Sequence, residues 1–333
     1  MSLVSAVSAF GFVSSLVTAV FMNLIFCGTP QFAVPALQAL IREGFAIQLV
    51  LTNRDEPSGR GYEPRPSPVK RVAEEHGLVV FHPARLRDRW TQVFLSGFQP
   101  DVIAVVAYGH IFPPWMIDLP RLGCVNLHAS LLPKYRGAAP IPWAIIRGER
   151  ITGVSTMKMD AGLDTGDVLL QLEIEIADED TTETLSERMS ALGAELLVDT
   201  LRGLDRAEIR PHPQEHGLAT LAPRLKKEDG QIDWSLAAEE IARRVRGLRP
   251  WPGAYTRFRG KTLQLWSATA VEVGTSGAIE PGVLVAEGGR LLVGCGHSTV
   301  LGIREVQLAD RKRMSARDFL NGVRLAAPEK LGP

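Results

Sequence analysis

Four short apolar runs, separated from one another by helical segments and loops, constrain the fold of this chain more than any other feature. Two of the intervening segments have the apolar spacing of a helix: PQFAVPALQALIREG at residues 30–44 and PSPVKRVAEEHG at residues 66–77. Strands that are apolar throughout and alternate with helices are typical of a parallel sheet covered on both faces. We therefore predict an α/β domain with a doubly wound sheet. Its strands are expected in NLIFCG, IQLVLT, DVIAVVAYG and CVNLHAS, at residues 23–28, 47–52, 101–109 and 124–130.

Two further elements complete this first domain, which we expect to span residues 22–207. The segment 152–177 alternates around a loop rich in Gly and Asp, which predicts a long hairpin. The segment 181–204 has the pattern of a capped amphipathic helix, with Thr182 near its start and Glu183 in its first turn.

The remaining chain predicts a linker and a small second domain. Residues 208–227 lack periodicity and are interpreted as a linker. Residues 228–333 begin with an amphipathic helix over 236–248 and carry 15 Lys and Arg against 12 Asp and Glu, a balance of +3 that favours this domain as the one that meets a polyanion. Its short strands, separated by Gly, predict a β-barrel: AYTRF, LQLWSA, GVLVAEGG, LLVGCG and GIREVQL.

Composition excludes some classes of protein. A net charge of zero over 333 residues excludes a strongly basic nucleic-acid coat, though not a local basic patch. Cys27, Cys124 and Cys295 form no CxxC pair, so neither a disulfide framework nor a thiolate zinc site is indicated, and a reducing compartment fits best.

The start of the chain is unusual because its first Lys, Arg, Asp or Glu is Arg42. Residues 1–21 are apolar and rich in Ser, but they lack the positive opening of a signal peptide and make a poor membrane span. Met22 opens a natural-looking strand, so we interpret residues 1–21 as an extension outside the fold.

A polar pair ends the fourth apolar run. Asn126 and His128 are two residues apart, so in a strand they point to the same side, and ligands of parallel sheets bind beyond the carboxyl ends of the strands. Such a pair suits a carbonyl whose oxygen becomes negative, because Asn can donate to that oxygen and His can donate or manage a proton. The plainer alternative is that both are turn residues.

The loop MDAGLDTGD offers Asp160, Asp164 and Asp167 between glycines. It could bind a divalent metal, although the EF-hand pattern is absent. It could instead bring one carboxylate to His128, or be a solvated hairpin turn. Spacing does not choose among these aspartates.

Two other segments could bind phosphate. CGTP after the first strand is half of a phosphate loop, but the full nucleotide motifs are missing, so Gly28 is expected to serve a tight turn. The loop over 53–70 could grip phosphates or be a solvated insertion; its basic residues are Arg54, Arg60, Arg65 and Lys70.

Taken together, these segments resemble the methionyl-tRNA formyltransferase family from Met22 to about Arg324. The residues that carry the resemblance to folate-dependent formyl transfer are GCVNLHASLLPKYRGAAPIPWAII and GVSTMKMDAGLDTGDVL. The segments that narrow it to the tRNA enzyme are PSGRGYEPRPSPVKRVAEEHGL and, in the second domain, LAPRLKKEDGQIDWS, RVRGLRPWPGAYT and SARDFLNGVR.

The resemblance implies a Rossmann-like catalytic domain followed by an OB-like barrel that helps to hold tRNA. It implies that 10-formyltetrahydrofolate donates a formyl group to the α-amine of initiator methionyl-tRNA, without a metal. Asn126, His128 and Asp164 would be the catalytic trio. The folate site would be lined by Ser130, Leu131, Leu132 and Pro133.

The chain departs from the family pattern after Gly-Arg-Gly, where Tyr62, Glu63 and Pro64 replace a more basic stretch. The grip of this loop on the acceptor stem is therefore in question. The candidate tRNA contacts are Arg60, Arg65 and Lys70 in the loop and Arg311, Lys312 and Arg313 in the barrel.

Rival functions share parts of this pattern. A formyltransferase for a small amine, or a hydrolase of the formyl donor, would keep the trio, whereas a non-enzymatic RNA-binding protein would leave it idle. We expect a cytoplasmic enzyme, monomeric and without membrane attachment.

Overall fold

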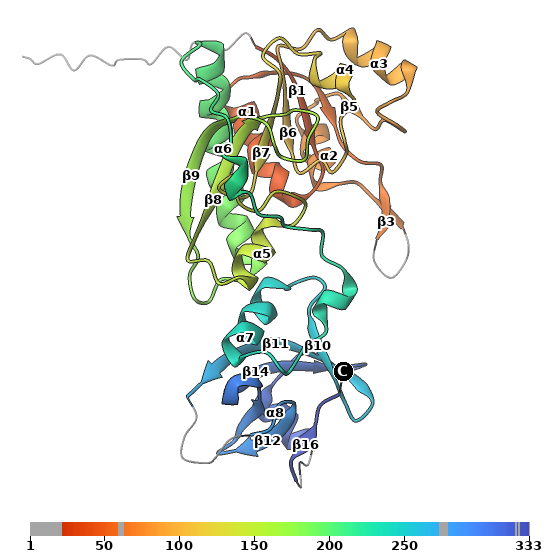
Figure 1. Cartoon of the computed structure of the whole chain (residues 1–333). Helices are drawn as coiled ribbons and strands as arrows, with labels where there is room; N and C mark the ends of the chain where they lie inside the picture. The colour runs from red at the N-terminus through yellow and green to blue at the C-terminus, as the bar shows by residue number, and fades with distance from the viewer. Residues whose placement is uncertain (1–21, 59–62, 273–278, 324, 326, 333) are drawn as a thin grey trace, which may run out of the picture.

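The computed structural model describes residues 22–58, 63–272, 279–323, 325 and 327–332. Figure 1 shows two domains, one above the other, joined by an extended segment. The expectations for residues 1–21, Arg60 and Tyr62 lie outside the described residues.

In the described chain, the N-terminal domain is built on a seven-stranded sheet in the order β5-β2-β1-β6-β7-β8-β9. The first five of these run parallel, and β8 and β9 add an antiparallel hairpin at one edge. The expected α/β sheet is therefore confirmed. Its strands are β1 (Asn23–Gly28), β2 (Ala46–Leu51), β5 (Val80–Phe81), β6 (Val102–Val106), β7 (Cys124–His128), β8 (Ile151–Lys158) and β9 (Val168–Glu175).

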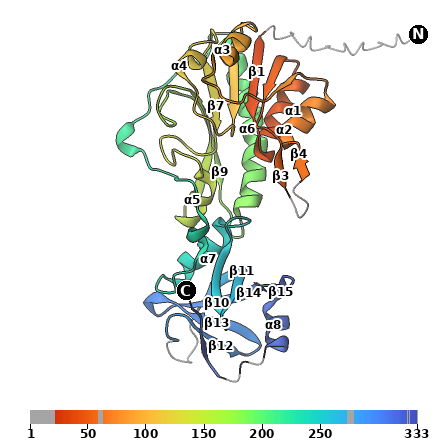
Figure 2. The ribbon, with the colours of Figure 1, turned by 90° about the vertical axis from the view of Figure 1, so that its right-hand side faces the viewer.

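Helices cover both faces of this sheet (Figure 2). In β1, Leu24 and Phe26 pack into the core on one face, and Ile25 and Cys27 into the core on the other. This is why the parallel strands are apolar without alternation. The first face is covered by α1 (Val34–Arg42), α2 (Pro68–Glu75) and α6 (Thr182–Asp205), the second by α3 (Arg89–Ser96) and α4 (Pro114–Ile117).

The strand order reverses between β1 and β6, because β2 and β5 lie on one side of this pair and β7 on the other. Such a reversal opens a crevice beyond the carboxyl ends of the strands. Asn126 and His128 lie at the end of β7, next to this switch point. The sheet therefore places the polar pair where α/β proteins bind their ligands.

The basic loop over 53–70 contains a short antiparallel ribbon, β3 (Glu56–Ser58) and β4 (Glu63–Arg65). It leads into α2, where the Ser67 hydroxyl caps the helix by accepting a hydrogen bond from the Lys70 N–H at 3.0 Å.

The C-terminal domain is an antiparallel barrel with the strand order β10-β11-β14-β13-β12-β16, and β15 pairs with β14. Arg257 of β10 exchanges backbone hydrogen bonds with Gly332, next to β16, and so joins the two ends of this order. The OB-like barrel is confirmed. Its elements are α7 (Ala238–Gly247), β10 (Ala254–Phe258), β11 (Lys261–Val271), β12 (Val283–Glu287), β13 (Arg290–Gly294), β14 (Val300–Leu308), β15 (Met314–Ser315), α8 (Ala316–Gly322) and β16 (Glu329–Lys330).

The two domains meet where α5 (Pro140–Ile146) packs against α7. The Thr182 hydroxyl donates to the Gly247 carbonyl at 2.6 Å, and the Arg246 guanidinium donates to the Asp180 carbonyl at 2.7 Å. Short 3-10 turns complete the described elements: η1 (Gln31–Ala33), η2 (His216–Leu218), η3 (Lys227–Gly230) and η4 (Gly296–Ser298). Among the described helices, none has the length and apolar character needed to cross a membrane.

Helix α6 begins at Thr182 and is capped by the residue before it. Thr181, not Thr182, is the N-cap. Its hydroxyl accepts from the Thr184 N–H, and the Thr184 hydroxyl accepts from the Thr181 N–H.

Loss of such a cap costs about 1 kcal/mol. We predict that Thr181→Ala lowers the free energy of unfolding by that amount in urea titrations followed by circular dichroism. Ser186→Ala, within the same helix, is the control and should not destabilise; equal effects would contradict the capping role.

Candidate active site

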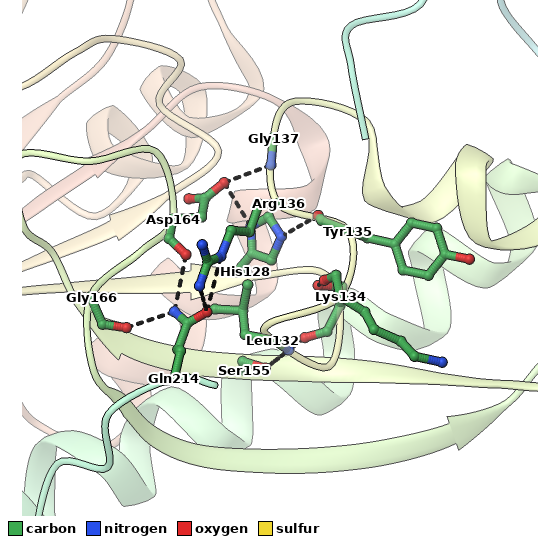
Figure 3. Close-up of polar contacts among 11 residues, drawn as sticks. His128, Leu132, Lys134, Tyr135, Arg136, Gly137, Ser155, Asp164, Gly166 and Gln214 are labelled. Atoms are coloured by element: carbon green, nitrogen blue, oxygen red, sulfur yellow. Dashed lines mark hydrogen bonds and ion pairs between the residues drawn. The ribbon is translucent and has the colours of Figure 1, made fainter. Parts of the chain in front are cut away.

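His128 is held at the end of β7 by its own backbone loop. Its ring is buried, with 6% of the residue exposed, and Nε2 lies 2.9 Å from the Tyr135 carbonyl (Figure 3). A carbonyl oxygen can only accept, so Nε2 carries a proton and donates. The Nδ1 atom is therefore the one left for chemistry. Asn126 lies two residues before His128 on the same side of the strand and is half-buried.

Asp164 comes from the loop between β8 and β9 and faces Nδ1. Its Oδ2 atom lies 3.7 Å from His128 Nδ1 and accepts a hydrogen bond from the Gly137 N–H at 2.8 Å. When the ring is protonated, Nδ1–H points at a carboxylate, and the pair can hold or release one proton. The structure thus brings together two residues that sequence spacing could not pair.

The other aspartates of this loop are placed differently. Asp160 organises the loop itself, because its carboxylate accepts from the Gly162 N–H at 2.9 Å and from the Thr165 hydroxyl at 2.7 Å. Asp167 contributes its backbone carbonyl to the Lys158 N–H at 2.9 Å. Among the described residues, no three His, Cys, Asp or Glu side chains are arranged to hold a metal ion.

The turn over residues 130–133 is anchored from the neighbouring hairpin. The buried Ser155 hydroxyl donates to the Ser130 carbonyl at 2.6 Å and accepts from the Leu132 N–H at 3.1 Å. The Gln171 amide donates to the Leu132 carbonyl at 3.0 Å. Ser130 is fully buried and donates its hydroxyl to the Lys134 carbonyl, so it shapes the turn from within. Leu131 and Pro133 remain partly exposed.

The candidate tRNA contacts are dispersed. Lys70 is tied to Asp55 at 2.7 Å, so its charge is largely neutralised locally. Arg65 is exposed at the end of the ribbon. Arg311, Lys312 and Arg313 are exposed next to β15, and Arg313 is paired with Glu305 and lies 4.8 Å from the Trp266 ring.

Burial raises the pKa values of two thiols and one tyrosine of this domain. Burial strongly raises the pKa of the Cys27 and Cys124 thiols, which lie within the sheet. Burial, together with the hydrogen bond to Glu149, raises the pKa of Tyr135 to about 12. The raised pKa values keep these groups protonated near neutral pH.

Sequence reasoning missed residues that hold this site. Gly137 donates to Asp164, and Gln214, in the segment interpreted as a linker, bonds to the loop that carries Asp164. The Gly-containing loop after the SLLP turn was a signal for Gly137. An isolated glutamine in a segment without periodicity carried no signal.

Residues 22–201 match the family model described as formyl transferase, and residues 224–324 match the model of its C-terminal domain. Together with the geometry around His128, these matches place the chain in the class of two-domain formyltransferases. Methionyl-tRNA formyltransferases from Koribacter versatilis (strain Ellin345) and Solibacter usitatus (strain Ellin6076) are 55% and 50% identical over 93% of this chain and 99% of each relative. The chain belongs to the methionyl-tRNA formyltransferase family.

Solved structures share the fold at lower identity. WlaRD, a sugar 3N-formyl transferase, matches with a TM-score of 0.63 and 14% identity, over 88% of this chain and 99% of that chain. HypX from Aquifex aeolicus in complex with tetrahydrofolic acid matches with a TM-score of 0.58 and 18% identity, over 90% of this chain and 47% of that chain. Methionyl-tRNA formyltransferase from Clostridium thermocellum matches with a TM-score of 0.54 and 21% identity, over 77% and 96%.

Gly137 offers a test of this geometry. Its φ is +120°, and an added Cβ would lie 2.7 Å from the Ala222 carbonyl oxygen. We predict that Gly137→Ala displaces the N–H that binds Asp164 and lowers kcat on the order of 10- to 100-fold, as small misplacements of catalytic groups do. Gly44→Ala is the matched control, since its φ is +74° with no atom within 4 Å of the added carbon. Wild-type kcat in Gly137→Ala, measured in steady-state assays, would contradict the role of this hydrogen bond.

Proposed function

We infer that this protein transfers the formyl group of 10-formyltetrahydrofolate to the α-amine of methionine esterified to initiator tRNA, for translation initiation. The observation that carries the inference is the approach of Asp164 to His128 at the end of β7, two residues from Asn126. It occurs in a chain whose two domains align over nearly their whole length with methionyl-tRNA formyltransferases.

The proposed chemistry uses these side chains in turn. The neutral amine attacks the formyl carbon, a new C–N bond forms, and the carbonyl oxygen becomes negative. The Asn126 amide donates to this oxygen, and preorganised donors of this kind stabilise tetrahedral intermediates. The amine proton passes to the pair formed by His128 and Asp164, directly or through water. Collapse then breaks the bond between the formyl carbon and N10 of the folate, and N10 takes up a proton.

Nδ1 is the ring atom of His128 available for this work, because Nε2–H is committed to the Tyr135 carbonyl. Nδ1 can accept the amine proton, and only once protonated can it donate to the oxyanion; the same atom faces Asp164. Asp164 therefore both orients the ring and competes for its proton. This arrangement suits a residue that receives a proton late in the attack and returns it to the leaving nitrogen.

The folate is proposed to lie against the turn of Ser130, Leu131, Leu132 and Pro133. Ser155 and Gln171 fix the backbone of this turn, so a ligand meets a preformed surface rather than a mobile loop. Leu131 and Pro133 supply the accessible apolar groups, whereas Ser130 and Leu132 act through their backbone positions.

For tRNA, we propose that Arg60 and Arg65 of the basic loop over 53–70 contact phosphates near the acceptor end. The exposed barrel residues Arg311 and Lys312 are proposed to contribute more than Arg313 or Lys70, which are paired with carboxylates. We further propose a monomer that works in the cytoplasm. Its three cysteines, all buried and unpaired, fit a reducing compartment.

Sugar formyltransferases and a folate-binding HypX share this fold, so the acceptor must be tested directly. The protein and 10-formyltetrahydrofolate are incubated together in separate reactions, each with a different acceptor. The acceptors are initiator methionyl-tRNA, elongator methionyl-tRNA, a small amine such as an aminosugar nucleotide, and none. Formyl-methionine formed preferentially on the initiator tRNA supports the inference. Formylation of the small amine, or release of formate alone, would replace it with one of the rival activities.

Asn126→Ala tests the oxyanion role. Removal of one donor should lower kcat on the order of 100- to 1,000-fold and leave KM for both substrates nearly unchanged. The control is Asn321→Ala on the exposed side of α8. A pure increase in KM would show that Asn126 binds a substrate without contacting the oxyanion.

The double variant Arg60→Ala/Arg65→Ala tests the basic loop over 53–70. Each lost phosphate contact should weaken tRNA binding and make the slope of log affinity against log salt shallower by about 0.9. The exposed pair Arg87→Ala/Arg89→Ala, at the start of α3, is the control. An unchanged slope in filter-binding titrations would show that Arg60 and Arg65 do not contact tRNA phosphates.

A further inference from the structure

Gln214 is buried in the segment between the two domains, with 7% of the residue exposed. Just before it, His212 exchanges two backbone hydrogen bonds with Val168 at the start of β9, at 2.8 and 2.9 Å. The connecting segment is therefore laid along the catalytic domain next to the loop that carries Asp164.

The Gln214 side chain uses its full hydrogen-bonding capacity (Figure 3). Its Nε2 donates to the backbone carbonyls of Asp164 at 3.0 Å and Gly166 at 2.6 Å. Its Oε1 accepts from Nε and Nη2 of Arg136 at 3.1 and 2.7 Å. Carbonyls only accept and a guanidinium only donates, so a single orientation of the amide satisfies all four bonds.

These bonds join two loops that both contact the Asp164 carboxylate. One loop holds Asp164 itself, in a left-handed backbone conformation with φ of +52°. The other holds Arg136 and, immediately after it, Gly137, whose N–H binds Oδ2. A displacement of either loop would change the distance of 3.7 Å between Oδ2 and His128 Nδ1.

Other bonds also restrain these loops. The Arg136 N–H donates to the Thr220 carbonyl at 2.9 Å, and the Arg136 carbonyl accepts from the Ala222 N–H at 2.7 Å, both in the connecting segment. Asp160 accepts from two groups within the acidic loop.

Non-glycine residues in the left-handed region carry a conformational cost of about 1 kcal/mol and persist where neighbouring contacts hold them. Arg136 is 7% exposed, and no carboxylate in the described part of the chain forms an ion pair with it. Its guanidinium is held by Gln214 and by His216 Nδ1, at 3.1 Å. The connecting segment thus supplies the bonds that both loops need.

We propose that Gln214 is a positioning residue for formyl transfer, which sets the approach of Asp164 to His128 by joining the loops on either side of the carboxylate. This rests on the role proposed above for Asp164. It also gives the segment between the domains a function beyond connection, because the same stretch that leads to the barrel holds the catalytic loop.

Two variants separate the bonds. Gln214→Glu keeps an acceptor for Arg136 and removes both donors to the Asp164 loop, whereas Gln214→Met, of similar length, removes all four bonds. Each is measured alongside Asp164→Asn and the double variant Gln214→Glu/Asp164→Asn. Gln92→Met on α3 is the control for glutamine replacement. Thermal unfolding of every variant sets an assay temperature at which all are folded.

Positioning predicts that Gln214→Glu and Gln214→Met lower kcat on the order of 10- to 100-fold, while KM for the formyl donor stays within about twofold of wild type. It also predicts that the double variant is no slower than Asp164→Asn alone, since Gln214 acts through that carboxylate. A purely structural glutamine would not give this non-additivity.

Two results would overturn the inference while the proposed function stands: wild-type kcat in Gln214→Glu when Asp164→Asn is impaired, or losses that multiply in the double variant. Wild-type kcat in Asp164→Asn has a different meaning. It would remove the proposed role of Asp164 and, with it, the reason for a positioning residue.

Discussion

The approach of Asp164 to a buried imidazole is the contact on which the rest of this structure depends. A carboxylate 3.7 Å from His128 Nδ1 is partly withdrawn from water, which is unfavourable unless donors surround it. The Gly137 N–H supplies one such donor, and the protonated ring can supply another. The loops around Asp164 therefore have to be held accurately, and much of the local hydrogen bonding serves that end.

The sheet and its hairpin divide the work of holding the site. The parallel strands, apolar and covered on both faces, place Asn126 and His128 on β7, next to the switch point between β1 and β6. The antiparallel hairpin of β8 and β9 supports the turn over residues 130–133 through Ser155 and carries the acidic loop. Rigid strands thus present the side chains, and loops bring in the groups that must approach from elsewhere in the chain.

The connecting segment changes how the two domains are understood. It binds the catalytic domain through His212, which is bonded to Val168, and through Gln214. The domains also meet directly where the Thr182 hydroxyl donates to the Gly247 carbonyl. A substrate as large as a tRNA contacts surfaces far from the reacting carbon. A segment that is bonded to the catalytic loop and leads into the barrel therefore has a place in organising both regions.

The amino-acid sequence by itself predicted the class of each domain, because hydrophobic periodicity and glycine spacing are local properties. The apolar run that contains Asn126 predicted a buried strand, and the alternating segment around the acidic loop predicted a hairpin. The sequence motifs also pointed to His128 and to the family. The family resemblance singled out Asp164, which spacing could not distinguish from Asp160, and the tertiary structure places its carboxylate by the ring. Only the tertiary structure showed that Thr181 caps α6 and that Gln214 reaches the acidic loop. These are contacts between segments distant in the chain, or choices between adjacent equivalent residues, and they are fixed by packing, which no local pattern encodes.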